Sequence, residues 1–183
     1  MLILNLSPFP SITTNNLVLR QITEEDVNEI LLLRSDKKVM KYIDRPISKS
    51  KEDASLYIQH ITDLHKNNEA ITWGIALKNN PQLIGYIGIW NIKKEHYRAE
   101  TGYALHTDHH RKGIMQEALS EILKYGFKEM KLHSIEANVN PLNIASIKLL
   151  ERNNFIREAY FKEDYFFNGK FLDTAIYSLL TPQ

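Results

Sequence analysis

Apolar and polar residues follow two different spacings along this chain. The segment Asn15–Ile22 (NNLVLRQI) alternates between the two kinds, which predicts a β-strand. Three later runs have the same character: residues 70–78 (AITWGIALK), 83–92 (LIGYIGIWNI) and 98–107 (RAETGYALHT). The NNPQ sequence between the first two indicates a hairpin turn. We expect these three runs to form an antiparallel meander.

Apolar residues instead recur at helical spacing in residues 23–34 and 50–66 of the first half. Both segments begin with a helix-capping signal, and a shorter segment between them, residues 35–43, is expected to be a helix that Pro46 stops. The two capping pairs are Thr23 with Asp26 and Ser50 with Asp53.

The second half predicts a helix from Gly113 to about Lys128, a short buried strand at 134–139 and an amphipathic helix at 143–154. The apolar positions of that last helix are Ile144, Ile147, Leu149 and Leu150. Residues 160–180 read as two strands around an Asn-Gly pair, a strong type I′ hairpin signal. No repeat or linker interrupts the chain, so we expect one α/β domain over residues 1–183.

The composition excludes several classes of protein and site but does not identify the function. The chain is 43% hydrophobic and 25% charged with a formal net charge of +1, which disfavours general nucleic-acid binding. It contains no cysteine, which excludes a disulfide framework, a cysteine-ligated zinc site and a thiol nucleophile. The N-terminus does not read as a signal peptide and no apolar run is long enough to span a membrane. We therefore expect a cytoplasmic protein.

Residues 106–123 (HTDHHRKGIMQEALSEIL) place positive charge and one glycine directly before a helix. A helix start exposes unpaired backbone N–H groups and the positive end of the helix dipole. With Gly113 allowing close approach and Arg111 and Lys112 adding charge, this loop could bind pyrophosphate. It matches neither the nucleotide P-loop nor the dinucleotide fingerprint. A solvated basic surface is the alternative interpretation.

The three histidines of this loop raise the question of a metal site. His106 and His110 would share a face only in a helix, yet they precede the predicted helix, and no carboxylate completes a ligand set with them or with His109. We predict no metal.

The order of these motifs resembles the acyl-CoA-binding core of the GCN5-related N-acetyltransferase (GNAT) superfamily, from Leu17 to Leu180. The phrases LVLRQITEED, LIGYIGI, AETGYAL and FFNGKFLDTAIYSLL are most similar to the branch of ribosomal-protein-alanine N-acetyltransferases. The resemblance implies a mixed, mostly antiparallel sheet of about six to seven strands, flanked by about four helices. It also implies that splayed central strands hold acetyl-CoA.

The family loop reads Gln/Arg-x-x-Gly-x-Gly/Ala, and residues 110–115 align with it. His110 stands in place of the first residue and Met115 in place of the last small one. Backbone amides around Leu105 are implied to polarise the thioester carbonyl. The full implied cofactor-binding set is Leu105, His106, Thr107, His110, Arg111, Lys112, Gly113, Ile114, Met115, Asn138, Asn143 and Ser146.

Two residues are implied to be catalytic. Glu100 lies where many family members carry a glutamate that deprotonates the amine through water, although it could instead be a surface carboxylate paired with Arg98 or a lysine. Ser146 lies where the family places a hydroxyl near the sulfur, and we favour it over Tyr160 or Tyr165 as the proton donor to the thiolate. Asn143 and Ser146 could also have only a structural role, as the N-cap of the helix and as a small residue in its first turn.

Acetyl transfer needs a neutral amine. At pH 7 roughly one protein α-amine in six is neutral, against roughly one lysine amine in 2,500. An α-amine acceptor therefore needs little help from a base, which fits a protein N-terminus. Small amines such as polyamines or antibiotics, and a non-catalytic acyl-CoA-binding module, remain alternatives, as do monomer and homodimer. The set Trp73, Trp90, Tyr86 and Phe155 is expected in the core, and Met40, Tyr42 and Ile43 on the acceptor wall.

Overall fold

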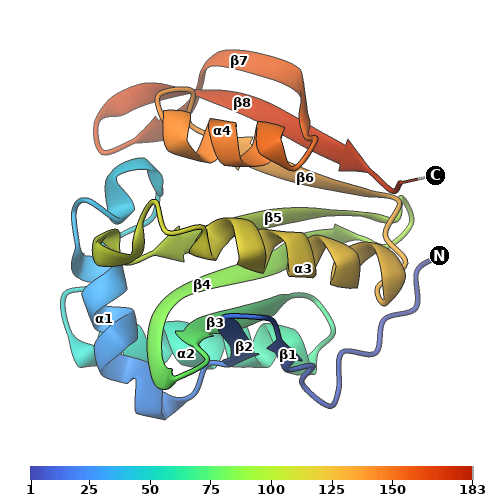
Figure 1. Ribbon diagram of the computed structural model, residues 1–183. Coiled ribbons are helices and arrows are strands. Elements are labelled where there is room, and N and C mark those ends of the chain that lie inside the picture. The colour runs from blue at the N-terminus through green and yellow to red at the C-terminus, as the bar shows by residue number, and fades with distance from the viewer. Residues whose placement is uncertain (183) are drawn as a thin grey trace.

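One mixed sheet with helices on both faces forms the molecule (Figure 1). The computed structural model describes residues 1–182, and over this range the sheet has eight strands in the order β1-β2-β3-β4-β5-β6-β8-β7. The strands are β1 (Ile12–Thr13), β2 (Leu17–Gln21), β3 (Ile71–Leu77), β4 (Asn80–Lys93), β5 (Arg98–Leu105), β6 (Ser134–Val139), β7 (Ile156–Phe167) and β8 (Lys170–Leu180). The expected fold class is confirmed. The sheet has more strands than the six to seven expected, and β1, a two-residue edge strand, was not foreseen.

Four α-helices accompany the sheet within residues 1–182. They are α1 (Val27–Ser35), α2 (Lys51–Lys66), α3 (Ile114–Lys128) and α4 (Ile144–Arg152). Single 3-10 turns are η1 (Glu24–Asp26), η2 (Met40–Tyr42) and η3 (Thr107–His109). Every neighbouring strand pair is antiparallel except β5 with β6, which are parallel because α3 carries the chain back between them.

The meander formed by β3, β4 and β5 agrees with the sequence prediction. Its first turn is tighter than the NNPQ signal suggested, since only Lys78 and Asn79 lie between the two strands and Pro81 is already part of β4. The later hairpin turns at Asn168 and Gly169, both with positive φ (49° and 78°), as expected for that pair.

Two apolar cores lie on opposite faces of the sheet. Helices α3 and α4, in front of the sheet in Figure 1, pack on a large core that includes Leu119, Ile122 and Leu150. Helices α1 and α2 pack on the other face around Ile30, Ile58 and buried positions of β4 and β5. The sheet therefore separates two compartments, and this separation decides where each site residue lies.

One local prediction, the short helix at residues 35–43, was wrong. Residues 35–43 do not form a separate α-helix. Ser35 ends α1, the side chain of Asp36 accepts the amide of Lys38 in a turn, and only the 3-10 turn η2 follows. Ile144 is 55% exposed at the start of α4, because the core contacts of that helix are made further along, at Ile147, Leu149 and Leu150.

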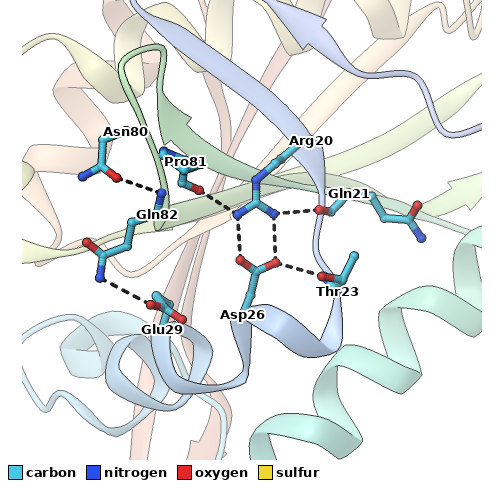
Figure 2. A network of polar contacts seen from close by, with 8 residues as sticks. All are labelled: Arg20, Gln21, Thr23, Asp26, Glu29, Asn80, Pro81 and Gln82. Carbon is cyan, nitrogen blue, oxygen red and sulfur yellow. Dashed lines mark hydrogen bonds and ion pairs between the residues drawn. The ribbon is translucent and has the colours of Figure 1, made fainter.

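The start of α1 is held by the polar network of Figure 2. The guanidinium of Arg20 on β2 binds both oxygens of Asp26 (2.9 and 2.7 Å) and also donates to the carbonyl of Pro81 on β4 (2.9 Å). Asp26, only 5% exposed, also accepts the backbone N–H of Thr23 (3.0 Å), which forms the predicted capping contact. The network thus fixes α1 relative to β2 and β4.

Candidate active site

Strands β5 and β6 separate part-way along their length. They pair only where Arg98–Glu100 faces Ser134–Glu136. Beyond this point β5 stays paired with β4 as far as Leu105, and β6 stays paired with β8 as far as Val139. The expected splay of the central strands is therefore present.

The backbone of β5 presents polar groups to this gap. The amide of His106 donates to the carbonyl of Ile84 (2.8 Å), which shows that the backbone N–H of His106 points toward β4. Because successive residues of an antiparallel strand alternate in direction, the N–H and C=O groups of Tyr103 and the N–H of Leu105 point away from β4, toward the gap beyond the segment that pairs with β6. An extended ligand could pair with them.

The loop before α3 has the backbone geometry expected of an anion site. Gly113 and Arg111 both have positive φ (77° and 60°). The first intrahelical bond runs from the amide of Glu117 to the carbonyl of Gly113, so the N–H groups of residues 114–116 lie at the open end of the helix. Arg111 and Lys112 are exposed beside it. These groups could hold a diphosphate.

The two departures from the family loop have structural roles of their own. The Nε2 of the His110 imidazole lies 3.0 Å from the carbonyl of Leu105, so as a donor the ring ties the loop to the end of β5. Met115 packs its side chain against the core beneath α3. Because both side chains have contacts within the protein, the candidate anion site consists mainly of backbone groups.

Ser146 has a partner that the sequence did not reveal. Its hydroxyl lies 2.8 Å from the hydroxyl of Tyr103 on β5, and its amide donates to the side chain of the N-cap residue Asn143 (3.2 Å). Burial raises the pKa of Tyr103 to about 12, against a smaller lowering by Ser146, so the phenol keeps its proton at neutral pH. Tyr103 and Ser146 lie on the α3–α4 face of the sheet.

The two tyrosines considered from sequence lie elsewhere. Tyr165 donates to the carbonyl of Asp44 and accepts from Arg45, each at 3.3 Å. Tyr160 donates to Asp173 on the hairpin. Alternation along RAETGYALHT could have placed Tyr103 on the face of Ala99 and Leu105, but its contact with Ser146 spans 43 positions of sequence.

Glu100 lies on the opposite face of β5. The side-chain amide of Asn91 donates to its carboxylate at 2.7 Å. Burial raises the pKa of Glu100, while hydrogen bonds from Asn91 and Trp90 lower it and the charge of Glu136 raises it again. A half-buried carboxylate with a raised pKa is suited to accept a proton.

Arg98 does not pair with Glu100. Its guanidinium donates to Glu136 (2.6 Å) and to the hydroxyl of Ser178 (3.0 Å), and Lys93 lies 3.8 Å from the other oxygen of Glu136. The interpretation of Glu100 as a carboxylate paired with Arg98 is therefore wrong.

The remaining expected residues are divided between the two faces. Asn138, two positions after Glu136 on β6, shares the face of Glu100 and is exposed there, away from Ser146. Met40 is buried (6% exposed), whereas Tyr42 and Ile43 are partly exposed. Of the four aromatic residues expected in the core, Trp73, Tyr86 and Phe155 are buried, but Trp90 is half-exposed.

Within residues 1–182, no three histidine or acidic side chains lie together as a metal site would require. Over the same range, no helix combines the length and apolar character needed to cross a membrane.

Comparison with known proteins decides the family. The sequence profile of the acetyltransferase (GNAT) domain matches residues 16–156, which include the splayed strands, the loop before α3 and α4. The chain belongs to the GNAT acetyltransferases. It is an N-acetyltransferase of this type, a fold that uses acetyl-CoA.

The relatives of this acetyltransferase include one whose name states no acceptor and others whose names state different acceptors. It is 35% identical to the uncharacterized N-acetyltransferase YoaA of Bacillus subtilis (96% of this chain, 99% of the relative). It is 28% identical to a spermidine N(1)-acetyltransferase of Vibrio cholerae (87% and 90%) and 25% identical to the ribosomal protein uS5-alanine N-acetyltransferase of Escherichia coli (96% and 93%). The fold superposes on a ribosomal L7/L12 α-N-protein acetyltransferase solved with coenzyme A (TM-score 0.85, 23% identity, 93% and 98% coverage).

Proposed function

We propose that this protein transfers an acetyl group from acetyl-CoA directly to a protein N-terminal α-amine, with Glu100 as the base and Ser146 as the proton donor. One observation carries the proposal. Glu100 and the Tyr103–Ser146 pair lie on opposite faces of β5, beside the point where β5 and β6 separate. A base and an acid on the two sides of one opening suit a reaction whose two substrates enter from opposite faces.

The loop at Gly113 would hold the diphosphate, and the free backbone edge of β5 would pair with the pantetheine arm. The Leu105 N–H, which points into the gap, would polarise the thioester carbonyl. The side-chain oxygen of Asn143 already caps α4, which leaves its NH₂ group available to the arm.

The transfer balances in protons and bonds. The amine nitrogen attacks the carbonyl carbon, the C–N bond forms and the C–S bond breaks. Glu100 takes the proton that the amine loses, directly or through water, and Ser146 gives its hydroxyl proton to the departing thiolate. Solvent then takes the proton from Glu100 and returns one to the Ser146 oxygen, so both side chains end the cycle as they began it. Tyr103, still protonated at neutral pH, donates a hydrogen bond to the Ser146 oxygen and stabilises the charge that develops there.

A terminal α-amine is supported by the uS5-alanine relative, which matches over 96% of this chain, and by the larger neutral fraction of α-amines at pH 7. The second candidate acceptor is a polyamine, supported by the spermidine relative. Comparing kcat/KM for an alanine-initiated peptide with that for spermidine separates the two. A higher value for spermidine would overturn the peptide assignment.

The roles of Glu100 and Ser146 are tested by Glu100→Gln and Ser146→Ala. We expect each change to lower kcat by about 10²-fold or more with little change in acetyl-CoA binding, since each removes a proton-transfer group. Glu95→Gln, an exposed acid in the β4–β5 turn, serves as the matched control and should keep full activity. Unchanged kcat in Glu100→Gln would remove Glu100 from the mechanism.

A further inference from the structure

Trp90 is a half-exposed tryptophan on the face of β4 that carries the candidate base. Its Cα is the ladder partner of Glu100, so the two side chains project from the same side of the sheet. The other tryptophan, Trp73, is fully buried and donates its indole N–H to the carbonyl of Pro10. Trp90, by contrast, is only partly buried and belongs to neither of the two apolar cores.

The indole of Trp90 lies across two glycines. A Cβ at Gly102 would come within 2.6 Å of the six-membered ring, and one at Gly88 would come within 3.0 Å. These glycines are ladder partners on β4 and β5, so the six-membered ring lies against both strands. Glycine is needed at Gly102 because any side chain would displace the ring from the sheet.

The position of this ring places it at the opening. Gly102 is two residues beyond Glu100, the last residue of β5 that pairs with β6, so the indole borders the splay. Further along the same face, Tyr86 and Ala104 are buried under the core of α1 and α2. Trp90 is the ladder partner of Glu100 on β4, so the indole lies beside this carboxylate, and it contributes to lowering the pKa of Glu100. The partly exposed indole thus lies directly beside the candidate base.

The chemistry of the Trp90 indole and its surroundings favours one type of acceptor. An indole face binds apolar groups and cations, and it lies beside a single carboxylate. The next carboxylate on the sheet, Glu136, is already paired with Arg98 and Lys93. Asp44 has Arg45 beside it. A polyamine, which carries several separated cations, would find no row of unpaired carboxylates among these residues.

We propose that Trp90 forms an acceptor subsite, on which an apolar side chain next to the reacting amine packs against the indole face. This inference rests on the proposed function and adds the class of acceptor: a peptide whose first residue is apolar. Trp90 touches the acceptor, and the glycines below it keep its ring in place.

The test compares two peptides that differ only in their first residue, leucine or glycine. We expect the wild type to prefer leucine by about tenfold in kcat/KM, since the larger side chain buries more apolar surface on the ring. Trp90→Ala should remove this preference by raising KM for the leucine peptide, with KM for acetyl-CoA unchanged. Trp90→Phe should keep part of it. Gly102→Ala should weaken it by displacing the ring.

Phe171→Ala is the matched control, because Phe171 is an exposed aromatic residue (64%) that packs against Phe166 on the far hairpin. It should keep the leucine preference. Thermal unfolding of each variant confirms that it is folded. A leucine preference that persists in folded Trp90→Ala, or its absence from the wild type, would overturn the inference.

A binding measurement distinguishes failure of the Trp90 subsite from failure of the proposed function. Titrating the leucine peptide into the protein saturated with coenzyme A should change tryptophan fluorescence in the wild type and not in Trp90→Phe. If this change occurs but no amine is acetylated, the subsite stands and the proposed function fails. If peptides are acetylated but the fluorescence of the wild type does not change, the function stands and the subsite fails.

Discussion

Asn91 adopts a left-handed backbone conformation (φ 49°) in the irregular segment of β4 between Trp90 and Lys93. This conformation is uncommon for a residue with a side chain, although Asn tolerates it better than most. Here it directs the side-chain amide onto Glu100 at 2.7 Å. At the residue scale, the local backbone irregularity therefore serves to position the candidate base.

Asn91→Gly tests this role cleanly, because glycine accepts positive φ and removes only the amide. The hydrogen bond from Asn91 lowers the pKa of Glu100, so its loss should raise that pKa further. Since the base must be ionised, the acidic limb of the pH–rate profile should move up by about one pH unit, as expected for a lost hydrogen bond to a charge. A profile that stays in place or moves down would contradict this role.

Tyr103→Phe tests the partner of Ser146. It removes one hydroxyl from a buried contact while keeping the ring, so the fold should persist. We expect kcat to fall by about tenfold, less than in Ser146→Ala, because only a supporting hydrogen bond is lost. Steady-state kinetics at saturating substrates measure this. A larger loss in Tyr103→Phe than in Ser146→Ala would instead make Tyr103 the proton donor.

The sequence located some of these residues and not others. Helix-capping logic and family resemblance brought Asn143 and Ser146 to the start of α4, where the structure has them. The contacts of Tyr103 and Asn91 could not be predicted, because one joins distant elements and the other depends on a bulge that no local pattern encodes. Trp90 was misjudged because its apolar sequence neighbours suggested burial, whereas it is only partly buried and belongs to neither apolar core.

At the scale of elements, helix α3 and its preceding loop depend on Gly113. Nothing lies within 4 Å of a Cβ built there, so backbone conformation is the only reason for glycine. Its positive φ turns the chain so that the helix start opens toward the splay. The sequence located the start of α3 correctly, because a lone glycine before an apolar-periodic segment is a local signal.

Gly113→Ala should therefore destabilise the fold by about 1 kcal/mol, the cost of a left-handed residue with a Cβ. It should also raise KM for acetyl-CoA several-fold, since the loop would relax. Gly113→Asn, which tolerates left-handed backbone, should have a smaller effect on both quantities. Equal effects of alanine and asparagine on acetyl-CoA binding would contradict this conformational explanation.

The Arg20–Asp26 ion pair at the start of α1 is expected to contribute to stability. Asp26→Ala leaves a partly buried guanidinium without its carboxylate and the Thr23 amide without its acceptor. We expect a loss of about 2 kcal/mol in the free energy of unfolding, below the range for fully buried pairs because Arg20 keeps some solvent contact. Urea denaturation measures it. Glu25→Ala, an exposed acid in the same turn, should cost little; an equal cost would contradict the assignment.

At the scale of the whole molecule, the sheet separates the groups to which we assign the two halves of the proposed reaction. Helices α3 and α4 cover one face and provide the anion loop and Ser146, while the opposite face carries Glu100 and Trp90. The alternating and helical patterns predicted most of these elements in order. The parting of β5 from β6 is not a local property, because it depends on the different partners that each strand keeps beyond the paired segment.

The most direct test of the account is to mix the protein with acetyl-CoA and an alanine-initiated peptide, and to follow thiol release together with the mass of the peptide. The account predicts one thiol released per acetyl group added, with fragmentation placing the acetyl group on the α-amine. Acetylation of a lysine side chain in the same peptide, or no transfer to any amine by protein that binds acetyl-CoA, would contradict it.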